Sequence, residues 1–135
     1  MEIQQRIMVV DDDQSVRIFL TKALEEYGYK VAAADGGRSA LKLVVEFKPD
    51  LVLLDVRMPE MNGVEVLKNL TETHPGLPVI MLTGMSDTKL LEQTFDIGAV
   101  DFITKPVLAS VLVARIRAKL RRVTPGRTDA SAKTD

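Results

Sequence analysis

The sequence predicts an α/β protein in which helices wrap both faces of a parallel β-sheet. Five short runs rich in apolar and β-branched residues alternate with five longer helical patterns. Several of the short runs are apolar at successive positions, which is typical of strands covered on both faces. Regular alternation of this kind favours parallel strands joined by right-handed crossovers. Five such strands suit a doubly wound (βα)5 sheet with the flavodoxin-like order 2-1-3-4-5.

The first helix has the clearest pattern. Apolar residues recur at three- and four-residue steps from Val16 to Tyr27. Asp13 is a suitable N-cap, and Gly28 stands where a left-handed residue commonly ends a helix. The five predicted strands are Ile7–Val10, Lys30–Ala34, Leu51–Leu54, Val79–Leu82 and Asp101–Thr104.

The remaining helices are bounded by proline and glycine. They are predicted at about Arg38–Phe47, Val64–Thr73, Asp87–Ile97 and Leu108–Arg122. Proline disfavours helix at the residue before it, so the second helix should end before Lys48-Pro49. The fourth helix has a weak stripe of Leu91 and Phe95, with Leu90 and Ile97 off it. We expect it to be among the less stable elements, because it has little apolar surface to bury.

Composition excludes several classes of function. The 135 residues include no Cys and one His, which argues against disulfides, thiolate catalysis and zinc sites. A net charge of −1 gives no overall attraction to nucleic acid or anionic membrane. No apolar run reaches the roughly 20 residues of a membrane span, and the N-terminus does not resemble a secretory signal. We therefore expect a cytoplasmic protein that binds neither membrane nor, through this chain, nucleic acid.

Residues 1–122 are predicted to form one domain. Residues 123–135 offer almost nothing to bury, and we interpret them as a disordered tail or the start of a linker.

Polar residues of interest follow the predicted strands. Asp11, Asp12 and Asp13 come after the first strand and Asp55 after the third, while Thr83 and Lys105 follow the fourth and fifth. In such sheets ligands bind beyond the carboxyl ends of the strands, where the strand order reverses. Neighbouring strands lie about 4.8 Å apart, so carboxylates that end strands one and three can share one ion. The long side chain of Lys105 can cover most of the roughly 10 Å that separates its backbone from that of Asp55.

Converging carboxylates repel each other, so either a pKa rises or a cation binds. Oxygen donors alone favour a hard cation, and Mg²⁺ suits a site that retains waters and accepts a phosphate. A carboxylate held beside a metal and a lysine can attack phosphorus and form an acyl phosphate. The metal and Lys105 would offset the charge of the transferring group. The hydroxyl of Thr83 offers a further donor.

Four segments resemble the signatures of response regulator receiver domains, in order and with the usual spacing. They are IMVVDDD at Ile7–Asp13, LLDVRMPEMNG at Leu53–Gly63, LTG at Leu82–Gly84 and DFITKP at Asp101–Pro106. The resemblance covers about residues 5 to 122. Each segment alone is weak evidence, but the four together are highly specific.

The resemblance implies a role for each matching position. Asp55 is the phosphoacceptor of a two-component, phosphorelay switch. Asp12 is a direct Mg²⁺ ligand, Asp11 acts mainly through water, and the backbone carbonyl of Arg57 completes the protein ligands. Thr83 and Lys105 contact the phosphoryl group, the Lys105–Pro106 bond is cis, and Phe102 is the aromatic whose rotamer follows phosphorylation.

The partner implied by the resemblance is a sensor histidine kinase or a histidine phosphotransfer protein. The phosphoryl group would draw Thr83 toward it, Phe102 would move, and the face formed by the fourth helix, fifth strand and fifth helix would control a partner, a dimer or an output domain. Such a switch is not an enzyme in the usual sense, because it catalyses only its own phosphorylation and dephosphorylation. The sequence does not decide between a stand-alone regulator and part of a longer protein.

Simpler interpretations account for some of these residues. Asp13 is best explained as a helix cap, and the basic residues of the last helix as a solvated face. An aspartyl-nucleophile phosphatase would need a second acid two residues after Asp55, where this chain has Arg57. A nucleotide carrier would need glycine in the first βα turn, which is acidic here.

Overall fold

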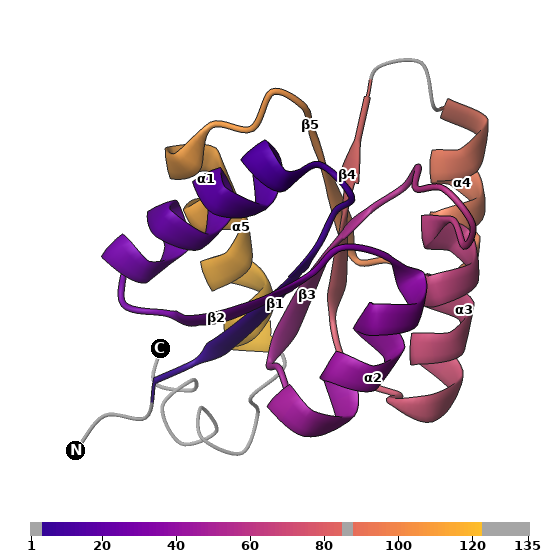
Figure 1. Ribbon diagram of the computed structural model, residues 1–135, viewed down its shortest axis with the longest axis horizontal. Coiled ribbons are helices and arrows are strands. Elements are labelled where there is room, and N and C mark those ends of the chain that lie inside the picture. The colour runs from indigo at the N-terminus through magenta and orange to yellow at the C-terminus, as the bar shows by residue number, and fades with distance from the viewer. Residues whose placement is uncertain (1–3, 85–87, 123–135) are drawn as a thin grey trace.

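A five-stranded parallel sheet lies between two layers of helices in the computed structural model, which describes residues 4–84 and 88–122 (Figure 1). The strand order is β2-β1-β3-β4-β5, and every adjacent pair is parallel, which confirms the predicted flavodoxin-like sheet. The elements are β1 Arg6–Val10, α1 Gln14–Glu26, β2 Lys30–Ala34, α2 Gly37–Phe47, β3 Leu51–Asp55, α3 Gly63–Thr73, β4 Val79–Thr83, α4 Thr88–Ile97, β5 Asp101–Thr104 and α5 Ala109–Arg122.

Alternate residues of the central strands enter opposite cores. In β1, Ile7 and Val9 pack with α1 and α5, whereas Met8 and Val10 pack with α2 and α3. β3 repeats the pattern one strand away, and all five of its residues are buried. This is the reason that the two strands are apolar at successive positions: each face of the sheet needs its own apolar set.

Local chemistry explains where the helices begin and end. The Asp13 side chain accepts a hydrogen bond from the Ser15 amide, so its predicted capping role is confirmed. α1 ends at Glu26, and Gly28 adopts φ of 94°, as its position predicted. α2 ends at Phe47, and Lys48 takes a left-handed φ of 54° immediately before Pro49. The Arg6 guanidinium donates to the Phe47 carbonyl at 2.7 Å and lies over the Phe47 ring, which ties this helix end to β1.

The apolar stripe predicted for α4 is partly wrong. Phe95 is 42% exposed, whereas Leu90, Leu91 and Ile97 all pack against the core. The helix turns Thr94, a polar residue, fully inward, and its hydroxyl donates to the Leu91 carbonyl. Thr94 is the one residue of α4 that is buried. The expected low stability of this helix stays a prediction.

Two expectations fall on residues outside the described ranges. These are the tail or linker at 123–135 and the start of the fourth helix at Asp87. Within the described ranges, no helix combines the length and apolar character that crossing a bilayer requires.

Candidate functional site

Two aspartates meet at the carboxyl edge of the sheet because their strands are neighbours in register. β1 pairs with β3, and Val10 lies opposite Leu54. Asp11 follows Val10, and Asp55 follows Leu54 as the last residue of β3. Alternation along the strands continues the side-chain direction of Val9 and Leu53, so both aspartates face the α1 and α5 side. The predicted convergence of these two side chains is therefore what the fold produces.

A cluster of three carboxylates forms at this edge. One oxygen each from Asp11, Asp12 and Asp55 lies within 4.8 Å of the others. Asp11 is fully buried and Asp55 is 5% exposed, whereas Asp12 is exposed to solvent. Buried carboxylates this close together either raise a pKa or bind a positive charge.

Lys105 supplies part of that charge. Its ammonium lies 2.9 Å from Asp11 Oδ2 and 3.4 Å from Asp55 Oδ1. The loop after β5 brings it there: the Lys105 amide donates to the Thr83 carbonyl at 2.9 Å, and the Lys105–Pro106 bond is cis, as the resemblance implied. The lysine side chain thus spans from β5 to the aspartates of β1 and β3.

The buried Asp11 carboxylate is only partly satisfied. Its Oδ1 accepts the Asp13 amide at 2.9 Å. Its Oδ2 has the Lys105 ammonium at 2.9 Å as its one described partner. The Arg17 guanidinium donates to the Asp11 carbonyl at 2.8 Å and fixes the loop between β1 and α1. A fully buried anionic oxygen with unused hydrogen-bonding capacity is well suited to face a cation.

The electrostatics of the cluster follow from burial. Desolvation, and next the negative charge of Asp11, raises the pKa of Asp55 to about 7, although Lys105 and the Arg57 amide oppose the rise. Partial burial by itself would lower the pKa of Lys105, but the carboxylates of Asp11 and Asp55 outweigh it, so that pKa lies above its ordinary value. Hydrogen bonds from Ser15 lower the pKa of the exposed Asp13, as suits a helix cap.

Of the other residues implied by the resemblance, Arg57 contacts Asp55, whereas the side chains of Thr83 and Phe102 contact other groups. Thr83 is buried, with 2% of its surface exposed, and its hydroxyl donates to the Gly84 carbonyl at 2.9 Å. Phe102 lies on β5 against the core and meets the Phe95 ring edge-to-face at 5.9 Å. The Arg57 amide approaches Asp55 Oδ1 at 3.4 Å, a long hydrogen bond.

The loop from Val56 to Asn62 is positioned by contacts that sequence reasoning missed. Gly63 lies so close to the Asp55 carbonyl that an added Cβ would collide with it, and its amide donates to Val56. The Met61 side chain packs onto Gly37 at the start of α2, where an added Cβ would lie 2.6 Å from the sulfur. Glu60, directly before Met61, adopts a left-handed φ of 64°. The only sequence-level sign of these contacts was glycine at 37 and 63.

The fold and this edge together define a doubly wound α/β protein with a partly buried carboxylate cluster at its carboxyl edge. Residues 7–117 match the family model of the response regulator receiver domain. The chain therefore belongs to the receiver domains of two-component signalling systems, and the resemblance drawn from its sequence is confirmed.

Relatives and solved structures agree with this assignment. The chain is 44% identical over 120 residues to "Response regulator MprA" of Mycolicibacterium vanbaalenii, covering 89% of this chain and 52% of that protein. It is 45% identical over 120 residues to "DNA-binding response regulator MtrA" of Mycobacterium tuberculosis, with coverage of 89% and 52%. The crystal structure of a CheY-like receiver domain protein from Methanospirillum hungatei matches with a TM-score of 0.86 and 30% identity, over 90% of this chain and 97% of that one.

The comparisons correct one expectation. Relatives named as DNA-binding response regulators contradict the prediction that nucleic acid is not among the partners. That prediction was drawn from the charge balance of 135 residues, yet the chain spans about half the length of the curated relatives it matches. Composition of one domain cannot exclude a partner that a protein of twice the length binds.

Proposed function

We propose that Asp55 is the phosphoacceptor of this receiver and that Mg²⁺ binds beside it. The observation that carries the proposal is the position of Asp55: 5% exposed, grouped with Asp11 and Asp12, and 3.4 Å from the Lys105 ammonium. Such a carboxylate is buried enough to be shielded from bulk water and keeps a positive group beside the oxygen that would attack.

The residues present fit a divalent cation. Three carboxylates offer hard oxygen donors, and the buried Asp11 Oδ2 is paired with the Lys105 ammonium at 2.9 Å. Asp12 and Asp55 would hold the ion directly, with the Arg57 carbonyl, and Asp11 would act mainly through water. When bound, Mg²⁺ supplies positive charge that stabilises the phosphoryl oxygens during transfer.

The transfer begins with a phosphohistidine on a sensor kinase or histidine phosphotransfer protein. A lone pair on an Asp55 carboxylate oxygen attacks phosphorus, the phosphorus–nitrogen bond breaks, and its electron pair returns to the imidazole, which then takes up a proton from solvent. With Lys105 beside it, the pKa of Asp55 is about 7, so a large share of this carboxyl is neutral near pH 7. A bound cation would lower the pKa further and favour the ionised form that attacks. Water later cleaves the acyl phosphate to restore Asp55 and release inorganic phosphate. The protein thus acts as a switch on itself.

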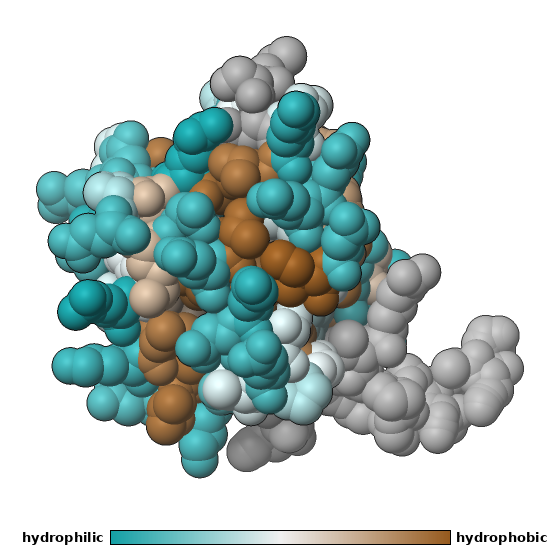
Figure 2. Space-filling model, turned by 90° about the vertical axis from the view of Figure 1, so that its right-hand side faces the viewer, coloured by the Kyte–Doolittle hydropathy of each residue, from teal (hydrophilic) through white to brown (hydrophobic). Residues whose placement is uncertain are grey.

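The output face in this proposal is formed by α4, β5 and α5. Its large apolar side chains are partly exposed: Phe95 at 42%, Leu108 at 64% and Val111 at 39%. On the side of the molecule that carries α3 and α4, apolar surface is visible among the polar side chains (Figure 2). Movement of Thr83 toward the phosphoryl group would free space for Phe102, whose edge-to-face contact with Phe95 couples β5 to the weakly buried α4.

The controlled activity is proposed to be DNA binding, as the names of the MtrA relatives state for those proteins. Residues 1–122 would be the receiver domain of a cytoplasmic regulator and residues 123–135 the beginning of a linker. The surface of α4, β5 and α5 would then serve for a dimer or for contact with the output part.

Beryllofluoride, a phosphoryl mimic, tests the proposal without a kinase. We expect it to bind only when Mg²⁺ is present and to shift the NMR signals of Thr83 and Phe102. Asp55→Asn should abolish these shifts, whereas Asp13→Asn, which changes the neighbouring cap, should retain them. Binding without Mg²⁺, or binding unchanged by Asp55→Asn, would overturn the assignment.

A further inference from the structure

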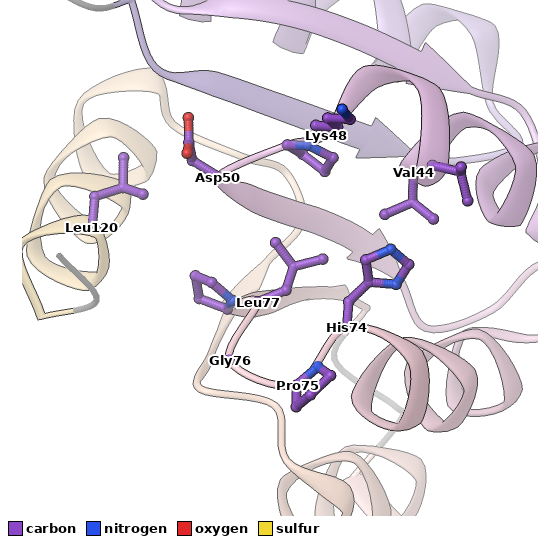
Figure 3. Close-up of a pocket in the computed structure, with 11 residues that line it drawn as sticks. Val44, Lys48, Asp50, His74, Pro75, Gly76, Leu77 and Leu120 are labelled. Atoms are coloured by element: carbon purple, nitrogen blue, oxygen red, sulfur yellow. The ribbon is translucent and has the colours of Figure 1, made fainter.

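A hollow lies beside the starts of β3 and β4, at the opposite end of the sheet from Asp11 and Asp55. It has a volume of about 520 Å³ and is lined by 11 residues from the end of α2, the start of β3, the loop between α3 and β4, and the last turns of α5 (Figure 3). Leu120 faces it from α5, and Val44 and His74 lie across from Leu120. The hollow therefore joins elements of both helical layers.

Its walls are apolar and stiff. Three prolines, Pro49, Pro75 and Pro78, line it together with aliphatic side chains, and Val45 on its rim is 61% exposed. Two of its polar groups already have partners: Asp50 Oδ2 accepts the Arg6 amide at 2.8 Å, and His74 Nδ1 lies 2.8 Å from the Thr73 hydroxyl. Because prolines restrict the backbone, binding an occupant costs little conformational entropy in these walls. The exposed surface of the hollow is mainly apolar, so an apolar occupant suits it.

We propose that the segment Val123–Pro125, which follows α5 in the sequence, docks in this hollow. Leu120, which lines the hollow, is two residues before Arg122, the last described residue. Three extended residues reach about 10 Å, enough to enter a hollow that begins at the helix end.

The sequence of the segment suits this role. Residues two apart in an extended chain point to the same side, so Val123 and Pro125 would form one apolar face in an extended segment. A residue before proline is biased toward extended conformations, which lowers the entropy lost when Thr124 is ordered. From Gly126 to Asp135 the chain has no apolar side chain larger than alanine, so the apolar face ends at Pro125.

A tethered segment fits better than a second copy of the chain. The hollow has 11 lining residues, whereas a stable protein interface takes about 20–30 residues on each side. A segment joined to the rim also has an effective concentration on the order of millimolar, which a free partner rarely reaches. Docking at this site would fix the direction in which the chain leaves the domain.

The one histidine of the chain provides a direct reporter, because His74 lines the hollow. In NMR spectra of the full 135-residue chain, Val123→Asp should shift the His74 imidazole signals, since a charged side chain would not enter apolar walls. Ala132→Asp adds the same charge outside the docking segment and should leave them in place. Equal His74 signals in the chain with Val123→Asp and in the unaltered chain would overturn the proposal.

The wall gives the reciprocal test. Backbone ¹⁵N relaxation should report that Val45→Glu lowers the order of residues 123–125 relative to the unaltered chain, while residues 130–135 stay the same. Ile18→Glu, at a residue 54% exposed on α1 and away from the hollow, should leave the order of residues 123–125 unchanged. Order that depends on protein concentration would assign the hollow to a second copy and refute docking of the segment. Neither experiment involves Asp55, so its failure would leave the proposed phosphoacceptor untouched.

Discussion

Replacing Asp55 by asparagine should stabilise the metal-free protein, by an amount that grows with pH. Burial and the charge of Asp11 raise the pKa of Asp55 from 3.8 to about 7. A carboxyl whose pKa is raised by folding contributes stability that is fully present below its unfolded pKa and is lost as pH rises through its folded pKa. As pH rises from the unfolded pKa to the folded pKa, the carboxyl ionises more readily in the unfolded chain, which destabilises the fold. Asparagine carries no charge, so the variant avoids this loss.

The size of the effect follows from the two pKa values. Each pKa unit corresponds to about 1.4 kcal/mol, so full ionisation of Asp55 destabilises the fold by about 4 kcal/mol above about pH 8. At about pH 5 the folded carboxyl is mostly neutral, and the same relation leaves a penalty of about 2 kcal/mol. The stability advantage of Asp55→Asn should therefore increase by about 2–3 kcal/mol between these pH values.

Urea unfolding followed by circular dichroism, in the presence of a chelator, measures this difference. Asp96→Asn is the matched control: it makes the same change at an exposed position on α4 and should give no comparable pH-dependent gain. An Asp55→Asn protein that is less stable than wild type at about pH 8, or an advantage that does not change with pH, would refute the electrostatic reasoning. Saturating Mg²⁺ should reduce the advantage, because the ion stabilises the ionised carboxylate.

Three further substitutions test separate parts of the site. Lys105→Met should slow phosphoryl transfer from phosphoramidate by about 10²-fold, because it removes a positive group 3.4 Å from Asp55 Oδ1. Single-turnover assays measure this rate, and a rate within about threefold of wild type would contradict the prediction. Gly63→Ala should lower the free energy of unfolding by about 1–3 kcal/mol and weaken Mg²⁺ binding, because the new Cβ would displace the Asp55 carbonyl. Urea denaturation measures the stability and calorimetry measures the Mg²⁺ affinity. If neither changes, Gly63 does not lie as close to the Asp55 carbonyl as the structure places it. Asp13→Ala should remove only the α1 cap, reducing stability by about 1 kcal/mol while Mg²⁺ affinity stays the same, so a large loss of affinity would mean that Asp13 belongs to the metal site.

The sheet and the convergence of the aspartates were predictable because they depend on patterns that the sequence states directly. Apolar strand runs fix which segments are buried, and parallel pairing then brings the carboxyl ends to one edge. Asp11 and Asp55 follow residues that lie opposite each other, so their proximity needs only the strand order and register. The roles of Thr83, Phe102 and Arg57 came from the family resemblance and stay predictions.

The contacts that hold the loops were beyond sequence reasoning because they depend on tertiary approach. Nothing in the local pattern says that Arg17 reaches back to the Asp11 carbonyl, or that Met61 packs on Gly37. The α4 stripe was wrong for a related reason: with few apolar residues, the helix is oriented by its neighbours, and Thr94 turns inward while Phe95 is exposed. Weak amphipathic patterns leave the rotation of a helix to tertiary packing.

Covalent phosphorylation of Asp55 is the central claim, and intact-protein mass spectrometry after incubation with phosphoramidate and Mg²⁺ tests it most directly. We predict the addition of one phosphoryl group, its loss when Mg²⁺ is chelated before the reaction, and its location at Asp55 after borohydride reduction and peptide mapping. A protein that gains no phosphoryl group, or an Asp55→Asn variant that gains one as readily as wild type, would contradict the account.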